Sequence, residues 1–96
     1  MDVNQPAFND RAKAYFTAYR DFAAAVVFMT RNARKSGVYL LQLVLEQAVK
    51  YEFTDLAADV SRMLRREFAR SGGDHEKNQY YTGLHRKYEE KRRYDM

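Results

Sequence analysis

The chain of 96 residues has no cysteine and no tryptophan, a single proline and only four glycines. The absence of cysteine excludes disulfides, thiolate metal sites and cysteine nucleophiles, and it is compatible with a reducing compartment. Because helix breakers are few and 46% of the residues are hydrophobic, the composition favours a folded, helical chain over disorder. We expect one small domain, residues 1–96, with a thin core.

No apolar run approaches the ~20 residues that a membrane-spanning helix needs, and the longest cover residues 22–29 and 38–41. Residues 1–4 lack the charged-then-apolar pattern of a secretory signal. We therefore expect an intracellular protein, in the cytoplasm first, with the mitochondrion and the nucleus as alternatives. The net charge of +4 suits nucleic acid, acidic proteins or anionic lipid and requires none of them.

Patterns that carry catalysis are also missing. His75 and His85 lack the spacing of metal ligands, and the serines form no recognisable triad pattern. The sequence therefore predicts a protein that is not an enzyme and that uses no cofactor or metal.

Apolar residues recur at three- and four-residue spacing and predict helices over about 6–35, 38–52, 55–70 and 74–93. Pro6 suits the first helical position, Gly37 is expected to end the first helix in the left-handed conformation, and Thr54 is expected to cap the third. A continuous helix through residues 53–54 is the alternative. The fold class is thus all-α, a small bundle of three to four helices.

The last helix has the weakest pattern, a narrow stripe of Tyr80, Tyr81, Leu84 and Tyr88 interrupted by Gly83. A glycine costs up to ~1 kcal/mol in a helix interior. Residues 74–96 are therefore expected either to dock through their tyrosines or to become ordered only on a partner. The two glycines after Ser71, Gly72 and Gly73, are expected to end the preceding helix.

On a helical wheel the first helix presents one apolar face. Three bulky apolar residues of the first two helices lie outside the apolar faces of their helices. The face consists of Phe8, Ala12, Tyr15, Phe16, Tyr19, Phe22, Ala23, Val26 and Val27, which we expect in the core. Phe28, Tyr39 and Leu43 lie among polar residues close to Gly37. Clustered exposed apolar groups with a polar rim mark interfaces, so these three predict a protein contact edged by Arg31 and Lys35. The alternatives are that the last helix covers them or that their exposure is incidental.

The third helix carries Arg62, Arg66 and Arg70 on one face. Like charges four residues apart destabilise a helix by about 0.2–0.5 kcal/mol per pair, so an anionic partner, either phosphate or an acidic protein surface, would relieve them. The alternative is a solvated face whose bases complement the helix dipole, with Asp59 pairing with Arg62. Glu67 falls inside the apolar stripe and is expected to pair with a tyrosine hydroxyl or an arginine from another helix. The alternative is that its side chain reaches solvent at the end of the stripe.

Residues 85–94 interleave tyrosines with lysines and arginines. Stacking aromatics and phosphate-binding bases are typical of proteins that bind RNA or single strands. The acidic residues Glu89 and Glu90 weaken that field, and a solvated or docking helix is the alternative.

Residues 40–92 loosely resemble the LYR-motif proteins of mitochondria, three-helix subunits and assembly factors that bind acyl carrier protein. The similarity consists of an apolar first helix, a second helix that ends Arg65-Arg66-Glu67-Phe68, a polar joint and a third helix. Leu40-Leu41-Gln42 stands where the family has Leu-Tyr-Arg, and the helix over 6–35 is an addition. The resemblance implies an accessory subunit.

The first prediction for function is a non-enzymatic helical protein that mediates protein–protein contact, as a subunit, an adaptor or a self-associating protein. The alternative of another class is a nucleic-acid binder that uses Arg62, Arg66, Arg70 and residues 85–94. A mitochondrial LYR-like subunit is a lesser alternative.

Overall fold

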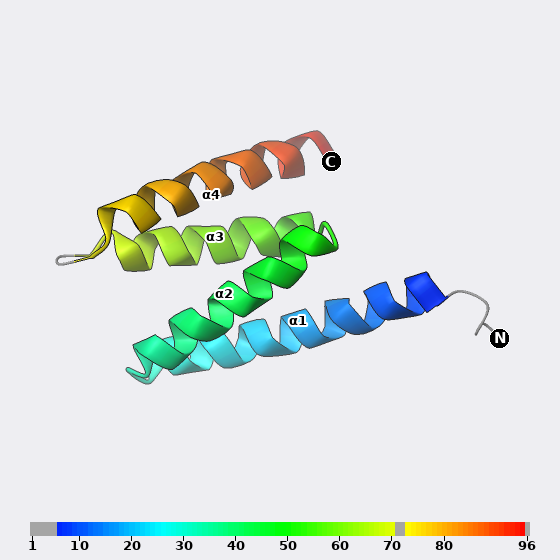
Figure 1. Ribbon diagram of the computed structural model, residues 1–96, viewed down its shortest axis with the longest axis horizontal. Coiled ribbons are helices and arrows are strands. Elements are labelled where there is room, and N and C mark those ends of the chain that lie inside the picture. Colours follow the sequence, from blue (N-terminus) through cyan, green and yellow to red (C-terminus); the bar gives the residue numbers. More distant parts are fainter. Residues whose placement is uncertain (1–5, 71–72, 96) are drawn as a thin grey trace.

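Four α-helices account for almost all of residues 6–70 and 73–95, which the computed structural model describes (Figure 1). They are α1 (Pro6–Thr30), α2 (Arg34–Lys50), α3 (Thr54–Phe68) and α4 (His75–Asp95). Each helix runs antiparallel to the one before it. These residues contain no strand, so the predicted all-α class is confirmed, with α2 and α3 as separate helices.

The helices pack in the order of the chain: α1 against α2, α2 against α3, and α3 against α4. The molecule is 52 Å long and 19 Å thick, and a helix with its side chains is about 10–12 Å across. The bundle is therefore about two helices thick. In Figure 1, α1 and α4 lie on opposite sides of it, so each of these outer helices is covered on one side by its neighbour in the chain.

α3 supplies the most deeply buried surface. Its buried residues are Leu56, Ala57, Ala58, Val60, Ser61 and Leu64. The small ones among them allow neighbouring helices to approach closely. α4 docks on α3 through Tyr81 and Tyr88, which are 8% and 6% exposed, and the rings of Tyr81 and Phe68 stack with their centroids 5.7 Å apart. Of the two expectations for the last helix, docking through its tyrosines is the one that the structure shows.

The first two helices end in a way that the sequence did not indicate. After α1, Asn32 adopts a left-handed backbone with φ 64°, and the Ala33 amide donates to the Phe28 carbonyl at 2.9 Å. After α2, Glu52 has φ 58° and the Phe53 amide donates to the Ala48 carbonyl at 2.8 Å. Both are Schellman endings, which usually place glycine at the left-handed position. Asparagine tolerates that conformation, and this explains why α1 ends without glycine.

Gly37 does not end the first helix, and that prediction is wrong. It lies in the first turns of α2 and is buried against α1. A Cβ atom there would stand 2.6 Å from Met29 Sδ and 3.3 Å from the Ala25 carbonyl oxygen. The glycine is thus required by the close approach of two helices, not by a turn.

Phe53 holds the N-terminal half of α1 against the link between α2 and α3. Its ring is 5% exposed and meets the Tyr15 ring edge-on at 5.3 Å. The Arg11 guanidinium lies 4.8 Å above the same ring and donates a hydrogen bond to the Tyr51 carbonyl at 3.0 Å. Thr54, predicted as the cap of α3, is instead its first residue, and Phe53 at the cap position makes no side-chain capping bond.

The apolar face predicted for α1 is only partly in the core. Ala18 and Ala25 are buried, whereas Phe16 is 71% exposed and Val27 is 47% exposed. The reason is that α1 packs mainly on α2. A single helix covers only part of the wide apolar sector of α1. The Phe8 side chain, and the predicted joint residues Ser71 and Gly72, lie outside the described residues.

None of the helices in the described part of the chain combines the length and the apolarity that crossing a membrane requires.

Ion pairs join the C-terminal half of α4 to α3. Arg92 lies 3.4 Å from Asp59 and 3.7 Å from Asp55 on α3, and 2.6 Å from Glu89 on α4 itself, measured between nitrogen and oxygen atoms. The hydrogen bond from Arg92 lowers the pKa of Glu89, and the same bond raises the pKa of Arg92. Lys91 adds a pair with Glu52 at 3.6 Å.

Two glycines in helix interiors should respond oppositely to alanine. Gly83 has open space where a Cβ would stand, so Gly83→Ala should raise the free energy of unfolding by about 0.5–1 kcal/mol through helix propensity. Gly37→Ala should show no such increase, because the added Cβ would press against Met29. Gly37→Leu should lower the free energy of unfolding by about 1–3 kcal/mol. Urea denaturation measures all three; a Gly37→Leu variant as stable as the unmodified chain would contradict the packing.

Acid should weaken the ion pair that Glu89 and Arg92 form within α4, and with it the stability of the fold. Because the folded state lowers the pKa of Glu89, the stability that this pair contributes is complete above the ordinary glutamate range and is lost as the pH falls through the lowered pKa. Arg92→Ala should remove most of this pH dependence and cost about 1 kcal/mol at neutral pH. Thermal melts at several pH values, with the exposed Arg86→Ala as control, test the prediction; parallel curves for Arg92→Ala and the unmodified chain would reject it.

Candidate functional site

A hollow of about 520 Å³ opens at the end of the molecule where α2 begins and α3 gives way to α4. We call it the basic hollow. Its basic side chains are Arg34, Lys35, Arg70 and Lys77, and its acids are Glu67 and Asp74. It exists because the antiparallel packing of α2, α3 and α4 brings their ends together there (Figure 1).

Both acids of the basic hollow already have partners. Arg34 Nη1 donates to Glu67 Oε1 at 2.8 Å, and the Glu67 side chain is only 16% exposed. Asp74 accepts the backbone N–H of Lys77 at 3.1 Å, which caps the start of α4. The backbone bond leaves the charge of Asp74 in place, but the four bases still outnumber the two acids, so a net positive charge remains for a ligand.

The same hollow has an apolar lining. Val38 and Phe68 are half-buried, and Tyr39 is 64% exposed. The Lys77 ammonium lies 5.2 Å from the centroid of the Phe68 ring, so a base and an aromatic ring share one surface. At the inner edge Gln42 donates a hydrogen bond to the Tyr81 hydroxyl at 3.3 Å, which links α2 to α4.

The structure joins residues that the sequence placed in two separate sites. Tyr39 and Lys35, predicted for protein contact, line the basic hollow together with Arg70, predicted for anion contact. Arg66 lines a neighbouring hollow with Met29 and Met63, and Arg34, Glu67 and Arg70 line both hollows. The pair expected for Glu67, an arginine from another helix, is confirmed in Arg34.

Other predicted residues lie elsewhere. Phe28 and Leu43 are each 39% exposed; Leu43 lines a different hollow, between α1 and α2. Arg31 is exposed in the turn between these helices. α4 packs on α3 and leaves Phe28, Tyr39 and Leu43 exposed, so the alternative that the last helix buries them is wrong. Arg62 pairs with an acid of the same helix: its Nη2 lies 4.0 Å from Asp59 Oδ1.

Several residues of the basic hollow were missed from the sequence, among them Arg34, Phe68 and Lys77. The need of Glu67 for a cationic partner was a signal for Arg34, because it predicted an arginine from another helix. Phe68 was assigned to the apolar stripe of its helix, and no sequence pattern relates Lys77 to α2.

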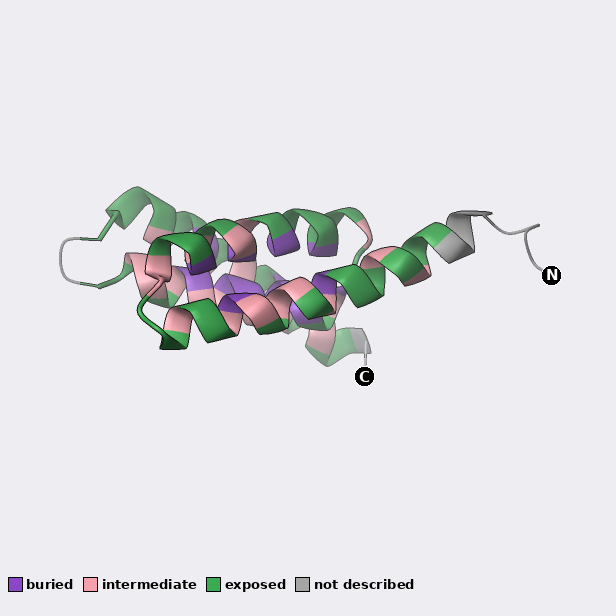
Figure 2. Cartoon of the chain, turned by 90° about the horizontal axis from the view of Figure 1, so that it is seen from below, coloured by how far each residue is buried: buried purple, intermediate pink, exposed green. Residues whose placement is uncertain are grey.

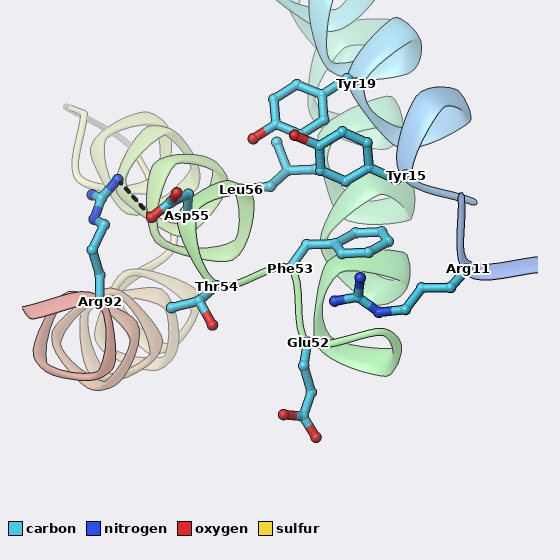
Figure 3. Close-up of a pocket in the computed structure, with 9 residues that line it drawn as sticks. All are labelled: Arg11, Tyr15, Tyr19, Glu52, Phe53, Thr54, Asp55, Leu56 and Arg92. Atoms are coloured by element: carbon cyan, nitrogen blue, oxygen red, sulfur yellow. Dashed lines mark ion pairs between the residues drawn. The ribbon is translucent and has the colours of Figure 1, made fainter. Parts of the chain in front are cut away.

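A second hollow, of about 340 Å³, lies between α1, the link from α2 to α3, and the end of α4 (Figure 3). Its charged groups are engaged: Arg92 with Asp55, and Arg11 with the Phe53 ring. Tyr19 points its hydroxyl into it, and burial raises the pKa of that hydroxyl. The Tyr19 hydroxyl therefore stays protonated at neutral pH. This hollow offers a ligand hydroxyl groups, while its charged side chains already have partners.

Some of the aromatic and basic residues of the 85–94 segment serve the fold, whereas Arg86, Arg93 and Tyr94 are exposed. Tyr88 is buried, Arg92 is paired with three acids, and His85 Nε2 lies 3.4 Å from Glu89 Oε2. A buried ring cannot stack on a nucleotide base. Within residues 6–70 and 73–95 no cluster of three or more histidine and acidic side chains has the geometry to hold a metal ion.

Comparison with protein-family models, with curated proteins and with solved structures finds no match to the chain. The resemblance of residues 40–92 to LYR-motif proteins therefore stays an interpretation of the sequence.

Removing one partner of the ion pair in the basic hollow should be costly. Arg34→Ala leaves the mostly covered Glu67 carboxylate without its hydrogen bond, and we expect a loss of about 1–2 kcal/mol in the free energy of unfolding. Arg66→Ala, at an exposed position on the same helix as Glu67, should stay within about 0.5 kcal/mol. Urea denaturation distinguishes the two; equal effects would show that the pair contributes nothing.

Proposed function

We propose that the protein is a non-catalytic interaction protein whose basic hollow binds an acidic segment of a partner protein that also carries an apolar anchor. The observation that supports this most is the meeting of exposed Tyr39 with Lys35, Arg70 and Lys77 around one cavity. The four bases of the hollow outnumber its two acids, so charge complementarity favours an anionic ligand.

The mixed lining favours a peptide over a bare phosphate. Tyrosine and arginine are the side chains most enriched at the energetic centres of protein interfaces, and here they face one cavity. An apolar side chain of the partner would contact Val38 and Phe68, while its carboxylates reach the bases at the edge. The hollow is large enough for one or two side chains, so we expect a short segment and modest affinity.

Nucleic acid is the competing ligand. Arg66 and Arg70 are exposed near the hollow and could hold phosphates. Of the two tyrosines in residues 85–94, Tyr88 is buried and Tyr94 is exposed, so this segment has one ring left for base stacking. The two ligands differ in how binding responds to salt, which provides the test.

The test compares two fluorescein-labelled probes by anisotropy: a short peptide of glutamates around a central Leu-Phe pair, and a single-stranded oligonucleotide of similar charge. We expect the peptide to bind more tightly, and Tyr39→Ser with Arg70→Glu to weaken it about tenfold or more, which corresponds to ~1.4 kcal/mol. Between 50 and 200 mM salt the peptide should lose far less affinity than a multi-phosphate ligand would.

The matched control is Tyr94→Ser with Arg86→Glu, which alters an exposed tyrosine and an exposed arginine on α4 away from the hollow. It should bind like the unmodified chain. Tight oligonucleotide binding with a steep loss in salt, or equal peptide binding by both double variants, would rule out the proposal.

A further inference from the structure

One side of α1 carries an apolar stripe that the described residues cover only in part, since Tyr19 packs against the core. Phe16 is 71% exposed and Ala23 is exposed, while Ala12, Tyr19 and Val26 are half-buried. We call these five residues the outer stripe. In Figure 2, α1 lies nearest the viewer and shows exposed and half-buried residues along its length.

The spacing of the outer stripe is four, three, four and three residues. This alternation keeps one line of side chains facing a neighbouring helix and is the spacing of paired helices. Two large residues, Phe16 and Tyr19, lie between two small ones, Ala12 and Ala23. The alanines leave holes that side chains of a second helix can enter. A flat membrane surface presents no side chains that would fill them.

The solvent side of the outer stripe is basic. Lys13 and Arg20 are seven residues apart, so they occupy the same position relative to the stripe in successive pairs of turns, and both are exposed. Charges beside an apolar stripe select the partner helix by attraction or repulsion. Arg20 lies 3.5 Å from Asp21, but its side chain remains 76% exposed, so both bases can still attract an acidic helix.

We propose that the outer stripe binds an amphipathic, acidic α-helix of a partner protein, with apolar residues on the stripe and glutamates or aspartates opposite Lys13 and Arg20. A second copy of this chain fits poorly. In an antiparallel pair of identical helices the same edges meet, so Lys13 and Arg20 of one copy would face the bases of the other. The site is separate from the basic hollow, and the inference does not rest on the function proposed for that hollow.

The test uses two synthetic helical peptides of about three heptads that differ only in their flanking residues, glutamate in one and lysine in the other. Each carries one tryptophan as a reporter, because the chain has none. We expect the glutamate peptide to bind at least about tenfold more tightly than the lysine peptide. Lys13→Glu with Arg20→Glu should reverse that preference, and Phe16→Ser should weaken binding of the glutamate peptide about tenfold or more.

Arg86→Glu with Arg93→Glu is the matched control, since these two exposed arginines on α4 have the same spacing of seven residues. It should leave the preference unchanged, as should Tyr39→Ser in the basic hollow. Circular dichroism checks that the Phe16→Ser variant is folded, and the charge reversal keeps the test valid if it is not.

Four outcomes would overturn the inference: no binding of the glutamate peptide, equal binding of both peptides, a preference that the charge reversal does not change, or loss of binding in the control variant. Two further measurements address other occupants. Sedimentation that shows a dimer abolished by Phe16→Ser would assign the stripe to a second copy. Binding to phosphatidylserine vesicles that Phe16→Ser abolishes, without peptide binding, would assign it to a membrane surface.

Discussion

The burial of α3 between α2 and α4 is the interaction on which the other surfaces depend. Leu56, Val60 and Leu64 are fully buried, and each such side chain contributes about 1.5–3 kcal/mol. Because α4 docks on α3 through Tyr81 and Tyr88, it does not reach α1 as a covering layer. α1 is left with α2 as its main support, and the two consequences are an apolar stripe open to solvent and a cavity where three helix ends converge.

The charge pattern follows from the same packing. α3 has Asp55 in its first turn and Arg65 and Arg66 in its last, an order that complements the helix dipole. Antiparallel packing then places the basic end of α3 beside the start of α2, where Arg34 and Lys35 stand. Bases in the first turn of a helix oppose its dipole, and α2 has no acid there to offset them. This local electrostatic cost is confined to the basic hollow, and such violations of a local rule are typical of functional surfaces.

Periodicity predicted the number of helices and most of their limits, because it depends on neighbours within each helix. It also predicted that Glu67 would pair with a tyrosine hydroxyl or an arginine from another helix, because a covered carboxylate needs a hydrogen-bond donor. It was wrong about Gly37, since a wheel does not distinguish a glycine that ends a helix from one that admits a neighbouring helix. It was wrong about Phe16 for a related reason: the wheel gives the width of an apolar sector, and only the tertiary arrangement decides which half is covered. The meeting of Tyr39 with Arg70 depends on packing between helices and has no local signal.

A chain of this size has a thin core, which makes the exposed stripe informative. A helix that served only its own bundle would need one apolar sector, centred on Ala18 and Ala25, with polar residues at positions 16 and 23. α1 instead keeps apolar residues over both sectors, at a heptad-like spacing that a single contact with α2 does not require. Tyr94, 86% exposed near the end of α4, shows that lone exposed rings also occur here and need no explanation. The outer stripe differs from Tyr94 in two ways: it continues along several turns of the helix, and it has bases on one edge. Both features are those by which one helix selects another.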